Sequence, residues 1–111
     1  MYWNDGDKYE GEWKNDQKEG KGIYYYHVGD KYEGEWKNGQ KEGKGIYYFN
    51  RNDEFKGDRY EGDFKNNKKN GKGIYYWNDG DKYEGEWKNG QKEGKGIYYS
   101  NRNDQFKGNI Y

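Results

Sequence analysis

Residues with catalytic chemistry are few in this chain, and their spacing does not form an active site. His27 is the single histidine. It occupies the place that Asn78 takes in another copy of the same segment, so we expect a solvated turn residue there. The carboxylates are many, but they recur at fixed intervals, which is typical of strand positions and not of one acid–base pair. We therefore predict that this chain has no catalytic residues and is not an enzyme.

Two short motifs carry weak cofactor or metal signals. Gly43-Lys44-Gly45 has the glycine spacing of a phosphate loop, but it falls inside an expected strand and opens no helix. Asn78-Asp79-Gly80-Asp81 has the start of a calcium loop, without the flanking helices or the closing glutamate. Cysteine is absent, which excludes disulfides and thiolate metal ligands. The sequence predicts no cofactor and no metal site.

The elements that position all these residues come from one repeated segment. Tyr32–Tyr48 recurs unchanged at Tyr83–Tyr99, and with a few changes at Tyr9–Tyr25 and Tyr60–Tyr76. At its centre lies Asn38-Gly39, the preferred pair for a type I′ turn, because both residues must adopt φ > 0. Each copy therefore predicts a β-hairpin.

That turn sets an expected register in which the side chains alternate between two faces. The expected cross-strand pairs are Lys37 with Gln40, Trp36 with Lys41, Gly34 with Gly43, Glu33 with Lys44, and Tyr32 with Gly45. One face then holds only large aromatics and glycines, and the glycines give the rings room to lie flat on bare backbone. The members of this face are Tyr32, Gly34, Trp36, Gly43, Gly45 and Tyr47.

The hairpins are joined by short loops of two kinds. A three-residue loop, Asn78-Asp79-Gly80, places Tyr75 opposite Tyr83 and Gly73 opposite Gly85, so the aromatic face continues into the next hairpin. Longer loops carry insertions at 50–56 and 101–107, whose Phe55 and Phe106 either cover aromatics or contact a partner. The expected fold is all-β: an elongated, single-layer, twisted antiparallel meander of repeated hairpins.

Repeats organise the whole chain as one array, 1–111. A partial unit, 1–8, precedes units at 9–31, 32–59, 60–82 and 83–110, and residue 111 begins another. Both ends fall inside a unit, which predicts either a longer array or self-association through open array ends. Only 28% of the residues are hydrophobic, but 22% are aromatic, and a repeat needs only to bury one face against its neighbours.

Charge and hydropathy exclude several classes of partner. The formal net charge is zero, so no bulk field attracts nucleic acid. No apolar run is long enough for a transmembrane helix or a signal peptide. These features predict an intracellular protein, either cytoplasmic, cytoskeletal or peripheral to a membrane.

The pattern Tyr-Glu-Gly-Glu-Trp-x-Asn-Gly-x-x-x-Gly-x-Gly-x-Tyr resembles the MORN (membrane occupation and recognition nexus) repeat. Its signature positions are matched by Tyr32, Gly34, Trp36, Gly39, Gly43 and Gly45, and by Tyr83, Gly85, Trp87, Gly90, Gly94 and Gly96. The chain departs from it at Asp16, Asn67 and Phe64 and in the insertions, which disturb even spacing. The resemblance implies a non-catalytic scaffold or tether at a cytoskeletal or membrane-proximal site.

Two sets of residues are candidates for binding. The first is a row of aromatics that forms either the core or a groove. The leading functional hypothesis is that this groove binds a peptide or helix of a protein partner. Stacking of a carbohydrate on the rings is a lesser hypothesis. The row comprises Tyr9, Trp13, Tyr32, Trp36, Tyr60, Phe64, Tyr83 and Trp87. The second set is an edge of lysines near the turns that either binds anionic phospholipid (phosphoinositide) headgroups, or is solvated and blocks aggregation. The candidate lipid-facing lysines are Lys14, Lys37, Lys41, Lys65, Lys88 and Lys92.

Overall fold

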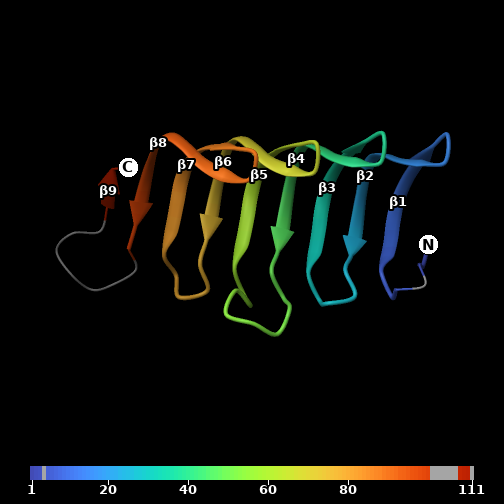
Figure 1. Cartoon of the computed structure of the whole chain (residues 1–111), viewed down its shortest axis with the longest axis horizontal. Helices are drawn as coiled ribbons and strands as arrows, with labels where there is room; N and C mark the ends of the chain where they lie inside the picture. Colours follow the sequence, from blue (N-terminus) through green and yellow to red (C-terminus); the bar gives the residue numbers. More distant parts are fainter. Residues whose placement is uncertain (4, 101–107, 111) are drawn as a thin grey trace.

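A computed structural model describes residues 1–3, 5–100 and 108–110, the last three by their backbone only. Its strands form one antiparallel sheet in which every strand pairs with the next along the chain (Figure 1). The sheet is open and elongated, with extents of 52 × 28 × 17 Å, so the predicted meander is confirmed. The strands are β1 (Lys8–Lys14), β2 (Gln17–Tyr25), β3 (Lys31–Lys37), β4 (Gln40–Tyr48), β5 (Arg59–Lys65), β6 (Lys68–Tyr76), β7 (Lys82–Lys88), β8 (Gln91–Tyr99) and β9 (Gly108–Ile110).

The hairpin turns have the predicted chemistry. Asn38 and Gly39 adopt φ of 51° and 80°, the positive pair that a type I′ turn requires. Asn66 and Asn67 adopt φ of 51° and 70° without any glycine, because asparagine tolerates the left-handed region. Asp16 and Asn67, which replace the turn glycine of the repeat pattern, therefore leave the hairpin geometry intact.

The predicted register within the hairpin is right near the turn and wrong beyond it. Trp36 faces Lys41 as expected, but Gly34 faces Gly45 rather than Gly43. Tyr32 consequently faces Tyr47, and Glu33 faces Ile46 instead of Lys44. Between the two matched positions β3 advances by two residues and β4 by four, which is a β-bulge. Because the slip equals the strand period of two, each side chain keeps its predicted face.

Two features of the sequence cause this bulge. Gly43 adopts φ of 73°, a conformation that glycine reaches without steric cost. The bulge removes the backbone N–H of Lys44 from the ladder, and the carboxylate of Glu35 accepts it at 2.8 Å. The same bond joins Lys21 to Glu12 at 2.6 Å and Lys72 to Asp63 at 3.2 Å. The acidic residue after the repeat's first glycine is therefore a bulge cap.

The loops between hairpins keep the array regular. Trp77 N–H donates to Asp81 O at 2.9 Å, which closes the predicted three-residue loop with Gly80 at φ of 98°. Tyr75 faces Tyr83 and Gly73 faces Gly85, as predicted. The insertion between β4 and β5 leaves the sheet as a loop at its edge (Figure 1), and Gly45 still faces Gly62. The inserted residues at 50–56 therefore do not disturb the spacing of the strands.

Each hairpin turn after the first leans over the hairpin that precedes it (Figure 1). Gly39 N–H donates to Lys18 O at 3.0 Å, and Gly90 N–H donates to Lys69 O at 2.9 Å.

The described part of the chain contains no helix of the length and apolarity that crossing a membrane requires.

Candidate functional site

The first tyrosine of each of the four complete units lies flat on the glycines of its own hairpin. Tyr32 is fully buried, and its hydroxyl donates to the carbonyl of Glu35 at 2.9 Å. A Cβ added at Gly45 would lie 2.3 Å from the Tyr32 hydroxyl oxygen, so only glycine fits beneath the ring. The glycines therefore serve packing, as the sequence predicts.

The tryptophans join one hairpin to the next. Trp36 packs edge-on against Tyr32 of its own hairpin and Tyr9 of the preceding one, with ring centroids 5.0 and 5.6 Å apart. Its Nε1 donates to Gly22 O of the preceding hairpin at 3.1 Å. Trp87 repeats this bond with Gly73 at 3.2 Å. These rings form the interface between units.

Most of the predicted partner-binding aromatics are accordingly core residues. Two are open to a partner: Trp13 and Phe55 are each 42% exposed, and Phe55 contacts Phe49 with ring centroids 6.3 Å apart. Phe106 lies outside the described residues. The buried members are Tyr9, Tyr32, Trp36, Tyr60, Phe64, Tyr83 and Trp87.

Lysines of the same face cover the aromatic rings. Lys41 Nζ lies 5.3 to 5.6 Å from the ring centroids of Tyr26, Tyr32 and Tyr47. Burial, and secondarily the charge of Lys18, lowers the pKa of Lys41 to about 8. The ring faces stabilise its ammonium form by a cation–π interaction. The equivalent positions over the other rings are Lys18, Lys69 and Lys92. The aromatic row is thus closed by the chain's own cations.

The predicted lysine edge divides into two sets. Lys14, Lys37, Lys65 and Lys88 are exposed and flank the hairpin turns. These turns lie along one edge of the sheet, and the loops between hairpins lie along the other (Figure 1). Lys41 and Lys92 instead lie over tyrosine rings of the aromatic face, at 5.5 and 4.9 Å from the ring centroids of Tyr32 and Tyr83. The first set remains available to an anionic surface.

Buried aspartates hold the loops between hairpins together, at the edge of the sheet opposite the hairpin turns. Asp30 is 1% exposed and accepts from the Tyr47 hydroxyl at 2.8 Å. Its other oxygen accepts from the backbone N–H groups of Asn50 and Arg51 at 2.9 and 3.0 Å. Asp58 accepts in the same way from Tyr75 at 2.6 Å. These carboxylates bind successive loops together and do not form an open acidic surface.

His27 belongs to one of these loops. Its Nδ1 lies 2.9 Å from Asp7 Oδ1, and its backbone N–H donates to the same oxygen at 2.7 Å. Ligand atoms of Asp5, Asp7 and His27 lie within 4.8 Å of one another. Asp7 bonds to the Tyr24 hydroxyl and to the His27 ring, and the Asp5 carboxylate accepts the Asp7 N–H. These hydrogen bonds within the loop explain why the three side chains lie close together.

The opposite face of the sheet is built from three charged rows. In the first, cations stack on tyrosines, as with Lys31 over Tyr48 at 4.7 Å and Arg59 over Tyr76 at 4.0 Å. In the second, glutamates alternate with isoleucines, because Glu33 faces both Ile23 and Ile46 on the neighbouring strands. In the third, lysines alternate with acids; Lys44 Nζ pairs with Asp63 at 2.5 Å.

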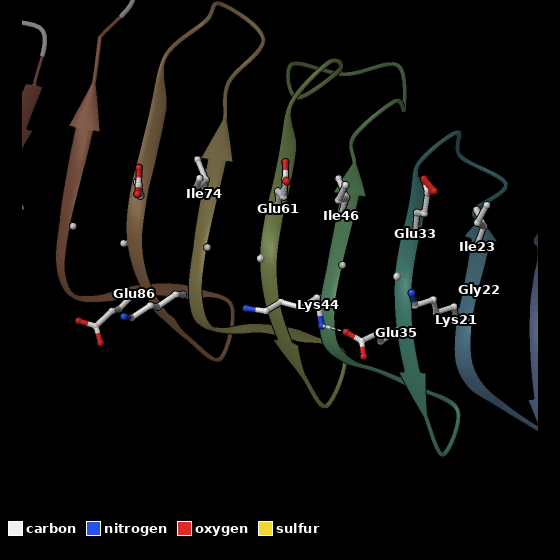
Figure 2. A pocket seen from close by; sticks show the side chains of 18 of the residues that line it. Lys21, Gly22, Ile23, Glu33, Glu35, Lys44, Ile46, Glu61, Ile74 and Glu86 are labelled. Atoms are coloured by element: carbon white, nitrogen blue, oxygen red, sulfur yellow. Dashed lines mark hydrogen bonds between the residues drawn. The ribbon is translucent and has the colours of Figure 1, made fainter.

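A groove of about 1600 Å³ runs between the second and third rows. Figure 2 shows Glu and Ile side chains along one wall and Lys and Glu side chains along the other. The floor is the glycine backbone, including Gly34, Gly45 and Gly62. With a strand spacing of about 4.8 Å, the groove from β1 to β8 is roughly 34 Å long. The groove therefore follows the array rather than a single unit.

Sequence reasoning missed this groove because it followed the aromatics. The available signal was the alternation within each strand, which places Glu33 and Ile46 on the face away from Tyr32. Ile is the only aliphatic side chain that recurs in every unit. Its position on the charged face, half-buried at Ile23, Ile46 and Ile74 and exposed at Ile97, is the feature that marks the surface.

Comparisons with known proteins agree with the repeated hairpin. A family model described as the MORN repeat matches residues 9–31, 32–54, 60–82 and 83–108. No curated protein matches the chain.

Proposed function

The chain belongs to the MORN repeat family, and on that premise we propose that it is a non-enzymatic repeat scaffold that binds a segment of a partner protein in its long groove. The scaffold acts inside the cell, at a cytoskeletal or membrane-proximal site, where it tethers the partner. The proposal rests on the family and on one structural observation, the groove itself.

The groove supports this function because every complete unit contributes to it in the same way. Each supplies a glutamate and an isoleucine to one wall, a lysine to the other, and glycines to the floor. By contrast, the aromatic face is filled by its own lysines. A surface that is apolar, rimmed by charge and long enough for an extended segment is typical of peptide recognition.

Selection from a phage-displayed library of random peptides of about 16 residues tests the scaffold function. We expect enriched peptides to bind the wild-type chain and to lose about tenfold or more in affinity for the double variant Ile46→Asp/Ile74→Asp. Lys37→Ala, at the turn edge, is the matched control and should bind like wild type. No enrichment, or equal binding to the groove variant, would refute this function.

A second candidate function is binding of anionic phospholipid headgroups. Its supporting observation is the exposed set Lys14, Lys37, Lys65 and Lys88, which lies along one side of the sheet. Each lysine near an anionic surface contributes about 1 kcal/mol, and salt screens the attraction.

Cosedimentation with vesicles tests this candidate directly. Phosphatidylserine vesicles at low salt should sediment the chain, whereas neutral vesicles or physiological salt should sediment much less. Lys37→Glu combined with Lys88→Glu should abolish the effect, and Lys56→Glu in the insertion is the control. Sedimentation that ignores lipid charge would count against the lysine edge.

A further inference from the structure

The groove has a period of two strands. Isoleucines 23, 46, 74 and 97 recur once per hairpin along one wall, and a glutamate lies on the strand between each pair. Adjacent strands are about 4.8 Å apart, so equivalent side chains repeat every ~9.6 Å. The insertion does not break this period, because Ile46 faces Glu61 directly across the β4–β5 pair. A ligand that uses all four positions must match that repeat.

One backbone conformation matches the period and keeps its side chains on one side. A polyproline II helix rises about 3.1 Å per residue with three residues per turn, so positions i and i+3 lie ~9.3 Å apart on the same face. An α-helix presents equivalent residues about every 10.5 Å in heptads, and loses register by roughly 3 Å over three repeats. In a β-strand, residues i and i+3 point to opposite faces.

The charge of the walls selects the other residues of the ligand. Six carboxylates and four lysines line the groove. Lys44 is already paired with Asp63 at 2.5 Å, and Glu35 accepts a backbone N–H. On the isoleucine wall Glu10 and Glu61 pair with Lys8 and Arg59 at 3.3 and 3.7 Å, whereas Glu33 and Glu84 form no ion pair within the described residues. Carboxylates therefore outnumber lysines in the groove lining, and the unpaired carboxylates of Glu33 and Glu84 lie beside the isoleucines.

From these observations we propose that the groove binds a polyproline II segment with a three-residue repeat, in which one position is apolar and another is lysine or arginine. The apolar residue of each triplet packs on an isoleucine. The cation reaches the glutamate on the next strand. This inference deepens the proposed scaffold function and rests on it.

Synthetic peptides of about 15 residues test the period and the charge together. The probe is the repeated triplet Leu-Pro-Lys, since a residue before proline favours the extended polyproline II region. Its affinity is measured by fluorescence anisotropy against a scrambled peptide of identical composition, a Leu-Pro-Glu triplet, and a Leu/Lys heptad helix. We expect the Leu-Pro-Lys triplet to bind about tenfold or more tightly than each of the others.

A charge reversal on the protein provides the second arm. Glu33→Lys should lower the preference for Leu-Pro-Lys over Leu-Pro-Glu by about fivefold or more. Glu54→Lys, in the insertion and outside the groove, makes the same change in net charge and should leave the preference unaltered. Far-UV circular dichroism shows whether both variants fold.

The outcomes separate this inference from the proposed function. Equal binding of the scrambled or heptad peptide, or equal effects of the two reversals, would overturn the polyproline II inference. If the library selection still yields groove-dependent peptides without a triplet period, the scaffold function stands and the inference fails. If neither probe nor library binds, both fail.

Discussion

The carboxylate of Glu35 accepts a hydrogen bond from the backbone N–H of Lys44 at 2.8 Å, across the bulge that bends each hairpin. This bond satisfies a donor that the strand ladder has lost, and it fixes where the register slips. The Tyr32 hydroxyl donates to the carbonyl of Glu35 itself. The bulge, the ring and the acidic cap thus form one unit that recurs along the array.

Removal of the bulge cap should destabilise the chain. Glu35→Ala leaves the Lys44 N–H without its acceptor, and we expect a loss of about 1–2 kcal/mol in the free energy of unfolding. Glu33→Ala is the matched control, because Glu33 is exposed two residues away and should change stability by less than about 0.5 kcal/mol. Urea titration measures both; equal effects of the two variants would contradict the cap.

A methyl group beneath a tyrosine ring should cost more than a strained turn. Gly45→Ala places a Cβ about 2.3 Å from the Tyr32 hydroxyl oxygen, so we expect a loss of about 2–3 kcal/mol. Gly39→Ala meets no atom within 4 Å but sits at φ of 80°, and it should lose about 1 kcal/mol. Thermal melts compare them. Shortening the ring with Tyr32→Leu should reduce the added cost of Gly45→Ala, and additive losses would argue against the contact.

The hydrogen bonds that Asp30 accepts from the loop predict a graded loss of stability in a series of Asp30 variants. Asp30→Ala leaves the Tyr47 hydroxyl and two backbone N–H groups without their acceptor, at a cost of about 2–4 kcal/mol. Asp30→Asn keeps one acceptor oxygen and should lose about half as much. Asn52→Ala, in the same insertion loop, is the neutral control. Chemical unfolding followed by tryptophan fluorescence gives the free energies of unfolding. If Asp30→Ala were as stable as wild type, Asp30 would not hold the loop in place.

Stability should rise between pH 8 and 10 and fall above it. Burial lowers the pKa of Lys41 to about 8 from 10.5, so the unfolded chain binds more protons in this range and folding gains about 1–2 kcal/mol as pH increases. Burial raises the pKa of Tyr32 above its ordinary value of 10.0. Above pH 10 the unfolded chain therefore loses tyrosine protons first, and stability decreases.

Lys41→Met tests the origin of that rise. The variant should lose much of the increase between pH 8 and 10, with the remainder coming from Lys18 and Lys69, whose pKa values burial also lowers. Lys37→Met, at an exposed turn position, should keep the wild-type profile. Urea unfolding at each pH supplies the measurement, and an unchanged slope in Lys41→Met would refute the assignment.

Local patterns in the sequence determined the hairpins, their turns and the two faces of the sheet. Asn-Gly pairs specify positive φ at both turn residues, and strand alternation assigns Tyr32, Gly34 and Trp36 to one face whatever the exact register. The repetition of the segment also determined the array and the family. These properties depend on neighbours within a few residues, which the sequence displays directly.

Only the tertiary structure decided the register beyond the bulge, the burial of the rings and the location of the groove. The slip at Gly43 depends on the carboxylate of Glu35, which accepts the N–H of Lys44 nine positions later in the chain, and counting from the turn could not reveal it. Lys41 was expected at an exposed edge, but it lies half-buried over three tyrosine rings. Each of these outcomes arises from packing between strands or hairpins, where the competition among contacts, rather than local propensity, sets the lowest free energy.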